Sequence, residues 1–257
     1  MKRDVPVQKV DMERKETYSE VMLHGCIPGC TPYHHSVLAG ESITLVPGDL
    51  HHMLILFSGE AEFITDGKSY PFDERALFVP HPDKEVTIKG ITDAHVLEMR
   101  WIMREEDHKL VEEYNIEYPF MQIYRTSWQY RDPNKTSTTI SRQMVKQRTM
   151  PRFCCGSVET YGLDAVRSHD HPMLDQYFFS FPENEMNVLI DFYPTHMSGC
   201  ELLYIPLGSM HGVDIAQGEH CHYLWLDFYP DNDLALKRLD FSHQGTGEMR
   251  SFDREKI

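Results

Sequence analysis

Short apolar runs separated by turn residues dominate the chain from Ile43 onward. In the first half, runs such as HHMLILF and ERALFVP are divided by Ser58-Gly59 and Asp66-Gly67, which are typical of β-hairpin turns. After Pro151 the pattern resumes in RFCCGSVETYG, LDQYFFSF, MNVLIDFYP, GCELLYIPLG and HYLWLDFYP. Because several short strands at regular spacing occur twice, the pattern predicts two tandem β-sandwiches or barrels of one type.

The two β-rich halves are joined by a segment of different character. Residues 104–117 (REEDHKLVEEYNIE) place apolar residues at helical spacing among acids, which predicts a short amphipathic helix. Turn residues (RDPNKTS) and then basic residues follow. We therefore predict a first domain at 1–103, a connector at 104–150, a second domain at 151–242 and a polar tail at 243–257.

Charge and composition narrow the classes of function. With 25 Lys and Arg against 40 Asp and Glu, the formal net charge is -15, which argues against a nucleic-acid partner. The N-terminal stretch is charged where a secretory peptide needs an apolar core, and no window approaches the ~18 apolar residues of a membrane helix. We therefore expect a cytoplasmic protein with no membrane partner.

The six cysteines are expected to be reduced thiols rather than a disulfide framework. His24, Cys26 and Cys30 in HGCIPGC are spaced closely enough to suggest a structural zinc site. Such a site usually has four ligands in two knuckles, and no partner knuckle is evident. A Gly/Pro loop with buried thiols is the favoured interpretation.

The stretch RSHDHPMLDQYFFSF carries the most specific chemistry. In an extended strand His169 and His171 face the same way, and two imidazoles on one side begin a metal site. An oxygen ligand follows four or five residues later, as Asp175 or Gln176, and YIPLGSMHGVD supplies His211 after a Pro-x-Gly turn. These spacings resemble the two motifs of the cupin superfamily, small β-barrels that bind one divalent metal.

The first half resembles a cupin as well, in LFSGEAEFITDGKSYPFDERALFVP. It lacks a His-x-His motif, and His51, His52 and His81 do not stand at the ligand spacings. The expected fold is therefore all-β, a bicupin of two jelly-roll-like barrels with a short helical connector. We expect the metal in the second barrel and none in the first.

Among bicupins, the chain resembles the 5-keto-4-deoxyuronate isomerase family over most of its length. The resemblance rests on DGKSYPFDERALFVPHPDKEV, KTSTTISRQ, SHDHPMLDQYFFSF, SMHGVD and Trp225 in YLWLDF. It implies metal ligands at His169, His171 and His211, with Gln176 where the family has a glutamate. Adjacent strand residues face opposite ways, so either Gln176 or Asp175 is the fourth ligand, and the family's spacing favours Gln176.

The resemblance implies a metal-dependent ketol isomerisation, through an enediolate, of a small sugar acid from pectin or related uronate breakdown. It also implies a homo-oligomer and one divalent metal, zinc first, with manganese or iron as alternatives. An acid substrate calls for a cation, and the three candidates that flank the second barrel are Arg142, Arg152 and Arg167. We predict substrate-binding residues at Arg142, Arg167 and Trp225.

The general base is not assigned by spacing. We predict Asp175 or Asp214 in this role, and the histidines of EHCHY (His220, His222) are further candidates. Because one fold hosts many chemistries, a metal-dependent lyase, a ferrous dioxygenase and a non-catalytic sugar-binding bicupin remain alternatives.

Overall fold

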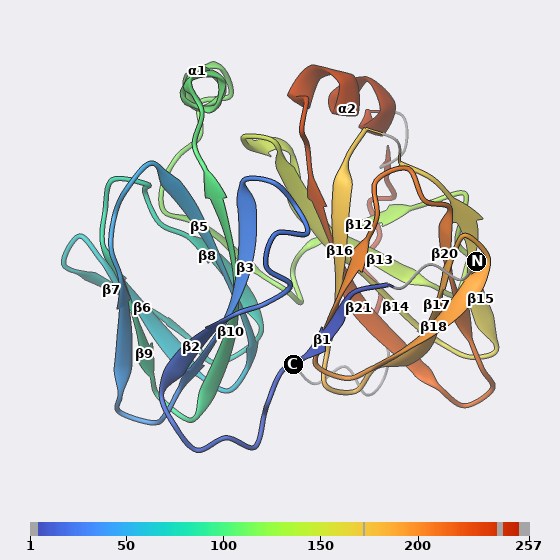
Figure 1. Ribbon diagram of the computed structural model, residues 1–257, viewed down its shortest axis with the longest axis horizontal. Helices are drawn as coiled ribbons and strands as arrows, with labels where there is room; N and C mark the ends of the chain where they lie inside the picture. The colour runs from blue at the N-terminus through green and yellow to red at the C-terminus, as the bar shows by residue number, and fades with distance from the viewer. Residues whose placement is uncertain (1–4, 172, 241–243, 252–257) are drawn as a thin grey trace. The chain divides into compact units, whose positions relative to one another are not determined.

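The computed structural model describes residues 5–171, 173–240 and 244–251 and divides the chain into two compact units (Figure 1). The N-terminal unit comprises Asp11–Thr126. The C-terminal unit comprises the residues up to Val10 together with the described residues from Ser127 onward. Each unit pairs a larger with a smaller antiparallel sheet, which is a jelly-roll-like arrangement.

The N-terminal unit is a sandwich of six and four strands. Leu54 and Val96 of the larger sheet and Phe63 and Ile88 of the smaller sheet belong to one buried apolar core. The larger sheet has the order β11 (Phe120–Ile123), β8 (Ala76–Val79), β5 (Leu50–Ser58), β10 (Ala94–Ile102), β3 (Cys30–Val37) and β2 (Tyr18–Val21). The smaller sheet has the order β4 (Ser42–Leu45), β9 (Val86–Gly90), β6 (Ala61–Thr65) and β7 (Lys68–Phe72).

A charged group is fully buried in this N-terminal unit. Glu98 on β10 accepts hydrogen bonds from His35 Nε2 at 2.7 Å, His52 Nδ1 at 2.6 Å, and the Arg100 guanidinium at 2.8 and 2.9 Å. Burial alone would raise the pKa of Glu98, but these donors outweigh it and hold the pKa well below its usual range. The carboxylate therefore stays ionised inside the unit.

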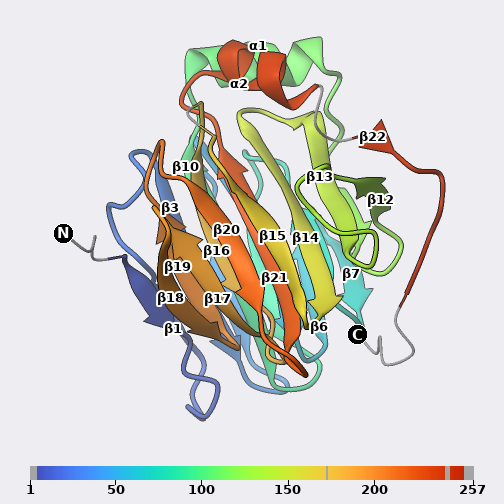
Figure 2. The ribbon, with the colours of Figure 1, turned by 90° about the vertical axis from the view of Figure 1, so that its right-hand side faces the viewer.

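The C-terminal unit combines an eight-stranded and a four-stranded sheet. The larger sheet has the order β1 (Val7–Lys9), β19 (Glu201–Ile205), β16 (Asp175–Ser180), β21 (His220–Phe228), β14 (Phe153–Tyr161), β13 (Ile140–Met150), β12 (Trp128–Arg131) and β22 (Gln244–Gly245). The smaller sheet, which faces the viewer in Figure 2, has the order β15 (Asp164–His169), β20 (His211–Ile215), β17 (Glu185–Ile190) and β18 (Tyr193–Ser198).

The observed division differs from the domain limits expected from the sequence at both ends of the chain. Strand β1 pairs with β19, with Val7 opposite Leu203, so the described residues up to Val10 join the C-terminal unit. In the expected polar tail, β22 pairs with β12, and the Arg250 guanidinium donates to the backbone oxygens of Ser137 and Thr139. Backbone pairing, which composition does not reveal, assigns these segments to a unit.

The expected connector also carries more structure than its composition indicated. Helix α1 (Glu105–Glu113) lies inside the predicted helical segment. The rest supplies strand β11 to the N-terminal unit and strands β12 and β13 to the C-terminal unit. A second helix, α2 (Asn232–Leu239), was not predicted; the Asp231 carboxylate caps it by accepting from the Leu234 N–H.

The cysteines and the helices can be compared with two expectations from the sequence, reduced thiols and no membrane-spanning helix. All six cysteines are free thiols, and five of them are buried. No helix in the described part of the chain is long and apolar enough to cross a lipid bilayer.

Candidate metal centre

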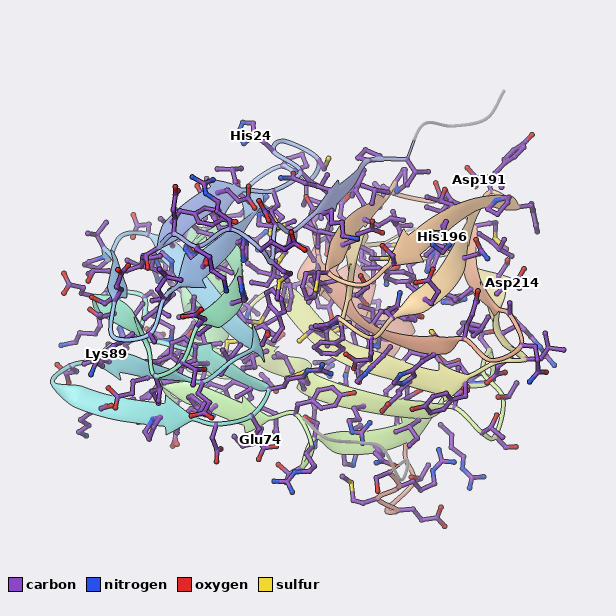
Figure 3. All side chains as sticks on the ribbon, turned by 90° about the horizontal axis from the view of Figure 1, so that it is seen from below. His24, Glu74, Lys89, Asp191, His196 and Asp214 are labelled. Carbon is purple, nitrogen blue, oxygen red and sulfur yellow. The ribbon has the colours of Figure 1, made fainter. Side chains whose placement is uncertain are left out.

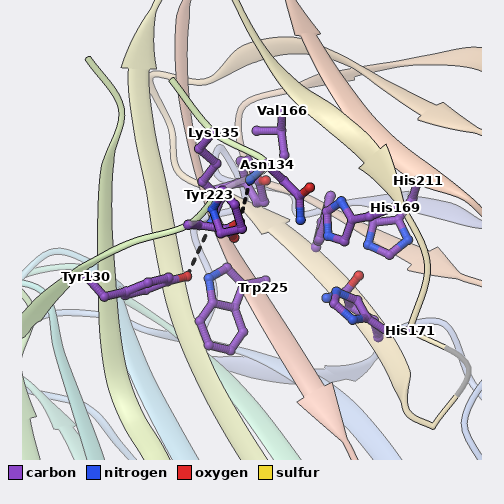
Figure 4. Close-up of a pocket in the computed structure, with 13 residues that line it drawn as sticks. Tyr130, Asn134, Lys135, Val166, His169, His171, His211, Tyr223 and Trp225 are labelled. Carbon is purple, nitrogen blue, oxygen red and sulfur yellow. Dashed lines mark hydrogen bonds and ion pairs between the residues drawn. The ribbon is translucent and has the colours of Figure 1, made fainter. Parts of the chain in front are cut away.

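Three histidines converge at one end of the C-terminal unit (Figure 4). His169 ends β15 and His211 begins β20, and the two are paired residues of these antiparallel strands; His171 follows two residues after His169. One ring nitrogen from each lies within 4.8 Å of the others. The ring centroids are 4.6 to 5.2 Å apart. This spacing suits three ligands of one metal ion.

Backbone carbonyls orient two of these rings. His169 Nδ1 lies 2.8 Å from the Arg167 carbonyl oxygen, and His211 Nδ1 lies 3.2 Å from that of Ser209. A carbonyl only accepts, so each Nδ1 carries the proton and each Nε2 keeps its lone pair for a metal. Burial and the nearby His169 lower the pKa of His211 to about 3, so this ring is neutral, as a ligand must be.

Gln176 supplies an oxygen beside the histidines. It lines the same pocket, is 4% exposed, and its amide Nε2 donates to Asp227 Oδ1 at 2.6 Å. Because a carboxylate accepts, this bond turns the amide oxygen Oε1 away from Asp227. Oε1 is buried and has no hydrogen-bond partner among the described residues. An unpartnered buried oxygen in the same pocket as three imidazoles is suited to act as a metal ligand.

Asp175, the other residue considered for the fourth ligand, does not line this pocket. Its carboxylate accepts a hydrogen bond from the Tyr204 hydroxyl at 3.2 Å, and burial raises its pKa. The strand alternates, so Asp175 and Gln176 face opposite sides of β16. The geometry therefore places Gln176 with the histidines and leaves Asp175 outside.

The pocket wall contains a buried cation, Lys135, which the sequence analysis does not predict as a site residue. Lys135 Nζ is 3.1 Å from Asp132 Oδ2 and 3.2 Å from the Tyr130 hydroxyl, and its side chain is 6% exposed. Burial alone would lower the pKa of Lys135, but Tyr130 and Asp132 outweigh it and raise the pKa. The lysine therefore stays charged. It belongs to KTSTTISRQ, which supported the family resemblance but otherwise looked like a turn.

The remaining wall of the pocket is mixed aromatic and polar. Trp225, predicted as a substrate-binding residue, is part of it and is 5% exposed. The described residues that line the pocket are Tyr130, Asp132, Pro133, Asn134, Lys135, Val166, His169, His171, Gln176, Phe178, His211, Tyr223 and Trp225. Asp132 is the one residue of this described lining that carries a carboxylate.

Other predicted residues lie outside the pocket. Arg142 is buried but pairs with Glu159, with Nη1 3.4 Å from Oε2. Arg152 lies over the Phe228 ring, with 4.8 Å to its centroid, and the Arg167 side chain is exposed. Asp214 is exposed as well and lies at the outer edge of the ribbon in Figure 3. None of these four side chains contributes to the described wall of the pocket.

The two histidines of EHCHY lie elsewhere too. His220 and His222 form a separate group with Glu159, within 4.8 Å of one another. Neither lines the three-histidine pocket.

Comparisons with known proteins agree with this architecture. No protein-family model matches the chain, and no curated protein matches it. Among solved structures, a cupin 2 conserved barrel domain protein from Leptotrichia buccalis is 14% identical, with a TM-score of 0.59 over 88% of this chain and 98% of that chain. An IolB-like protein from Salmonella typhimurium is also 14% identical, with a TM-score of 0.63 over 79% and 84%.

A third similar structure is the oxalate decarboxylase of Lactobacillus farciminis, bound to formate. It is 10% identical, with a TM-score of 0.65, and the match covers 94% of this chain and 95% of that chain. These likenesses show an all-β bicupin fold.

Proposed function

We propose that this protein is a metal-dependent isomerase of a small sugar acid, of the 5-keto-4-deoxyuronate type. The observation that carries the proposal is the convergence, in one pocket, of a three-histidine group, an unpartnered amide oxygen and a buried charged lysine. A metal ligand set and an anion-binding group in one pocket suit a substrate that has both a carbonyl and a carboxylate.

The proposed ligands are the Nε2 atoms of His169, His171 and His211 and the Oε1 atom of Gln176. Three imidazoles and one oxygen suit zinc first, with manganese or iron as alternatives. When bound, such an ion polarises the substrate carbonyl and its neighbouring hydroxyl and lowers the cost of removing the proton between them. Gln176 is neutral, so the ligand set adds no negative charge to oppose this polarisation.

Lys135 takes the role for which the sequence suggested Arg142 and Arg167. Its ammonium is buried, charged and in the pocket wall, so it can bind the substrate carboxylate. Trp225 and Phe178 supply apolar surface against which one face of the sugar can pack. Asp132, whose pKa Lys135 lowers against the effect of burial, is ionised and is the proposed proton acceptor in place of Asp175 and Asp214.

The test compares variants that separate metal binding from substrate binding. The purified protein would be assayed for metal content and for isomerisation of 5-keto-4-deoxyuronate followed by nuclear magnetic resonance. His211→Ala should lose the pocket metal and turnover together. Lys135→Met should keep the metal but raise KM for the acid at least ~10-fold, because the substrate carboxylate loses its buried ion pair with the Lys135 ammonium. Arg167→Met, on an exposed side chain, is the matched control and should behave as the wild type.

Three results would contradict the proposal. Oxygen consumption with bound iron would indicate a dioxygenase. Carbon–carbon or carbon–oxygen cleavage of the sugar acid would indicate a lyase. A fully metal-loaded protein that binds uronates without converting them would indicate a sugar-binding bicupin.

A further inference from the structure

A second group of metal-ligand side chains lies on the other face of the larger C-terminal sheet. Glu159 is near the end of β14, and His220 and His222 are at the start of β21. Glu159 and His222 are directly paired across these strands. Alternation along β21 points His220 and His222 away from Tyr223 and Trp225, which line the three-histidine pocket. The two groups are therefore separate sites.

The potential ligand atoms of this group converge within a few ångströms. His220 Nε2 lies 3.0 Å and His222 Nδ1 lies 3.8 Å from the same Glu159 oxygen, Oε1. Glu183, in the turn between β16 and β17, brings Oε1 to 2.6 Å from His222 Nδ1. One ligand atom each of Glu159, His220 and His222 thus lie within 4.8 Å of one another, and Glu183 reaches this group through its contact with His222.

The surroundings hold these side chains in place. Glu159 and His222 are each 2% exposed, and the Phe181 ring centroid lies 4.5 Å from that of His222. The Tyr161 ring stacks on His220 at 4.2 Å. Arg142 approaches the second oxygen of Glu159, Oε2, at 3.4 Å, so Oε1 is the oxygen that faces the imidazoles. A carboxylate ligand whose other oxygen is held by a cation is an ordinary arrangement around a metal ion.

We propose that Glu159, His220, His222 and Glu183 bind a second divalent metal ion, zinc by preference. Around four-coordinate zinc, with ligands at about 2.0–2.1 Å, neighbouring donor atoms lie roughly 3.3–3.4 Å apart, and the separations of 3.0, 3.8 and 2.6 Å are each within ~1 Å of that value. Two carboxylates give the site a charge of -2, and Arg142 offsets part of it. A divalent cation offsets the negative charge that Arg142 leaves on this largely buried acidic group.

The metal ion would have a structural role, because its ligands come from three segments of the chain and do not line the three-histidine pocket. It joins the end of β14, the start of β21 and the turn after β16, and these segments belong to one sheet and the connection that leaves it. The ion would therefore stabilise the C-terminal unit, and it would remain when the metal of the three-histidine pocket is removed.

The test counts zinc per chain by mass spectrometry after loading and extensive dialysis. The wild type should retain two equivalents. His220→Ala and, independently, Glu183→Gln should each retain one, and His211→Ala should also retain one because it loses the other ion. Glu183 and His220 are partly exposed, so these substitutions are tolerable for folding. His196→Ala is the matched control, because it removes an exposed histidine that pairs with Glu185 at 2.8 Å outside both sites.

Cobalt substitution gives a second readout that does not depend on activity. Added to His211→Ala, cobalt should produce the visible absorption of a tetrahedral site, and this signal should vanish in His211→Ala/His220→Ala. One zinc equivalent in the wild type that His220→Ala still retains, or two equivalents retained by His220→Ala, would overturn the proposal. A single equivalent that is sensitive to His220 but not to His211 would support this site and overturn the proposed function of the pocket instead.

Discussion

The amide of Gln176 is oriented by the carboxylate of Asp227, a residue too distant in the sequence for a local pattern to predict the contact. Asp227 lies on β21, 51 positions away in the chain, and accepts the amide N–H at 2.6 Å. Burial raises the pKa of Asp227 to about 7, against the Gln176 amide and Lys135, which lower it. A glutamate at position 176 would place two carboxylates side by side in a buried site, so the pair Gln176 and Asp227 is mutually adapted.

We therefore predict that Gln176→Glu, which introduces the residue of the family that the sequence resembles, weakens metal binding instead of strengthening it. Its Kd for zinc should rise at least ~10-fold, and the unfolding free energy should fall by about 2–4 kcal/mol, because two buried like charges face each other. Adding Asp227→Asn should return both quantities close to wild type, since an amide can again donate across the pair. Chelator competition and thermal unfolding measure the two effects. Tighter zinc binding by the single variant would refute the pairing argument.

Spacing was sufficient for some site residues and not for others. His169, His171 and Gln176 lie within eight positions of one another in the sequence, and the short connection from the end of β15 to the start of β16 brings them into one pocket. Lys135 reaches the pocket from a loop, and its charge depends on contacts with Tyr130 and Asp132 that only the folded chain creates. For the same reason Arg142, a buried cation in a suitable sequence, points to Glu159 instead.

At the scale of elements, one residue of β14 lets the indole of Trp225 pack directly against the strand. A Cβ built on Gly156 would lie 2.0 Å from the Arg142 carbonyl oxygen and 2.5 Å from Trp225 Cζ2. Such distances are not compatible with any side chain. The absence of a Cβ at Gly156 lets the indole of Trp225 lie against β14 and form part of the pocket wall.

Gly156→Ala should therefore lower the unfolding free energy by about 3 kcal/mol and displace Trp225, because overpacking shifts backbone and ring together. Denaturant titration measures the first effect, and the tryptophan emission spectrum measures the second. Gly48→Ala is the control, since its nearest non-neighbouring atom is Leu50 Cδ1 at 3.8 Å, and it should change stability by under ~0.5 kcal/mol. Equal effects at the two glycines would contradict the close-approach argument.

Some strands can be predicted from the sequence pattern and others cannot. The hairpin strands β6 and β7 follow from alternation around Asp66-Gly67, whose two residues have φ of 50° and 72°. The polar sequence ISRQMVKQRTM predicts a connector, yet it forms strand β13, and six consecutive residues of this strand are buried. Its buried polar side chains find partners across the sheet, as Arg142 does in Glu159, and such partners are invisible in a local window.

At the scale of the whole molecule, the repeated strand pattern predicted two β-rich units and the resemblance to cupin motifs predicted their bicupin fold, but neither predicted which unit the ends of the chain join. The two units have separate interiors of different character. The N-terminal unit buries the ionised Glu98 among His35, His52 and Arg100, and the C-terminal unit carries the three-histidine pocket. The units should therefore respond differently to acid.

Glu98 makes the N-terminal unit acid-sensitive. Its folded pKa is depressed relative to the ordinary value of 4.5, so its contribution to stability is present above pH 4.5 and is lost as the pH falls below that value. Glu98→Gln should cost about 3 kcal/mol at neutral pH, because Arg100 loses its counter-ion, and the difference from wild type should shrink below pH 4.5. Hydrogen exchange of β5 and β10 amides at several pH values checks this. A difference that is constant with pH would contradict it.

The pairing of β1 with β19 has a consequence for the order of events on the ribosome. Val7 leaves the exit tunnel roughly 200 residues before Leu203, which at cellular synthesis rates means a wait of about 10–40 s. During that time the N-terminal unit can fold, because its residues are already complete, while β1 has no sheet to join. The C-terminal unit is thus completed by a strand that is synthesised before the N-terminal unit. Until β1 pairs with β19, Leu202 and Leu203 lie on an unpaired sheet edge, where a chaperone or a second nascent chain can bind in place of β1.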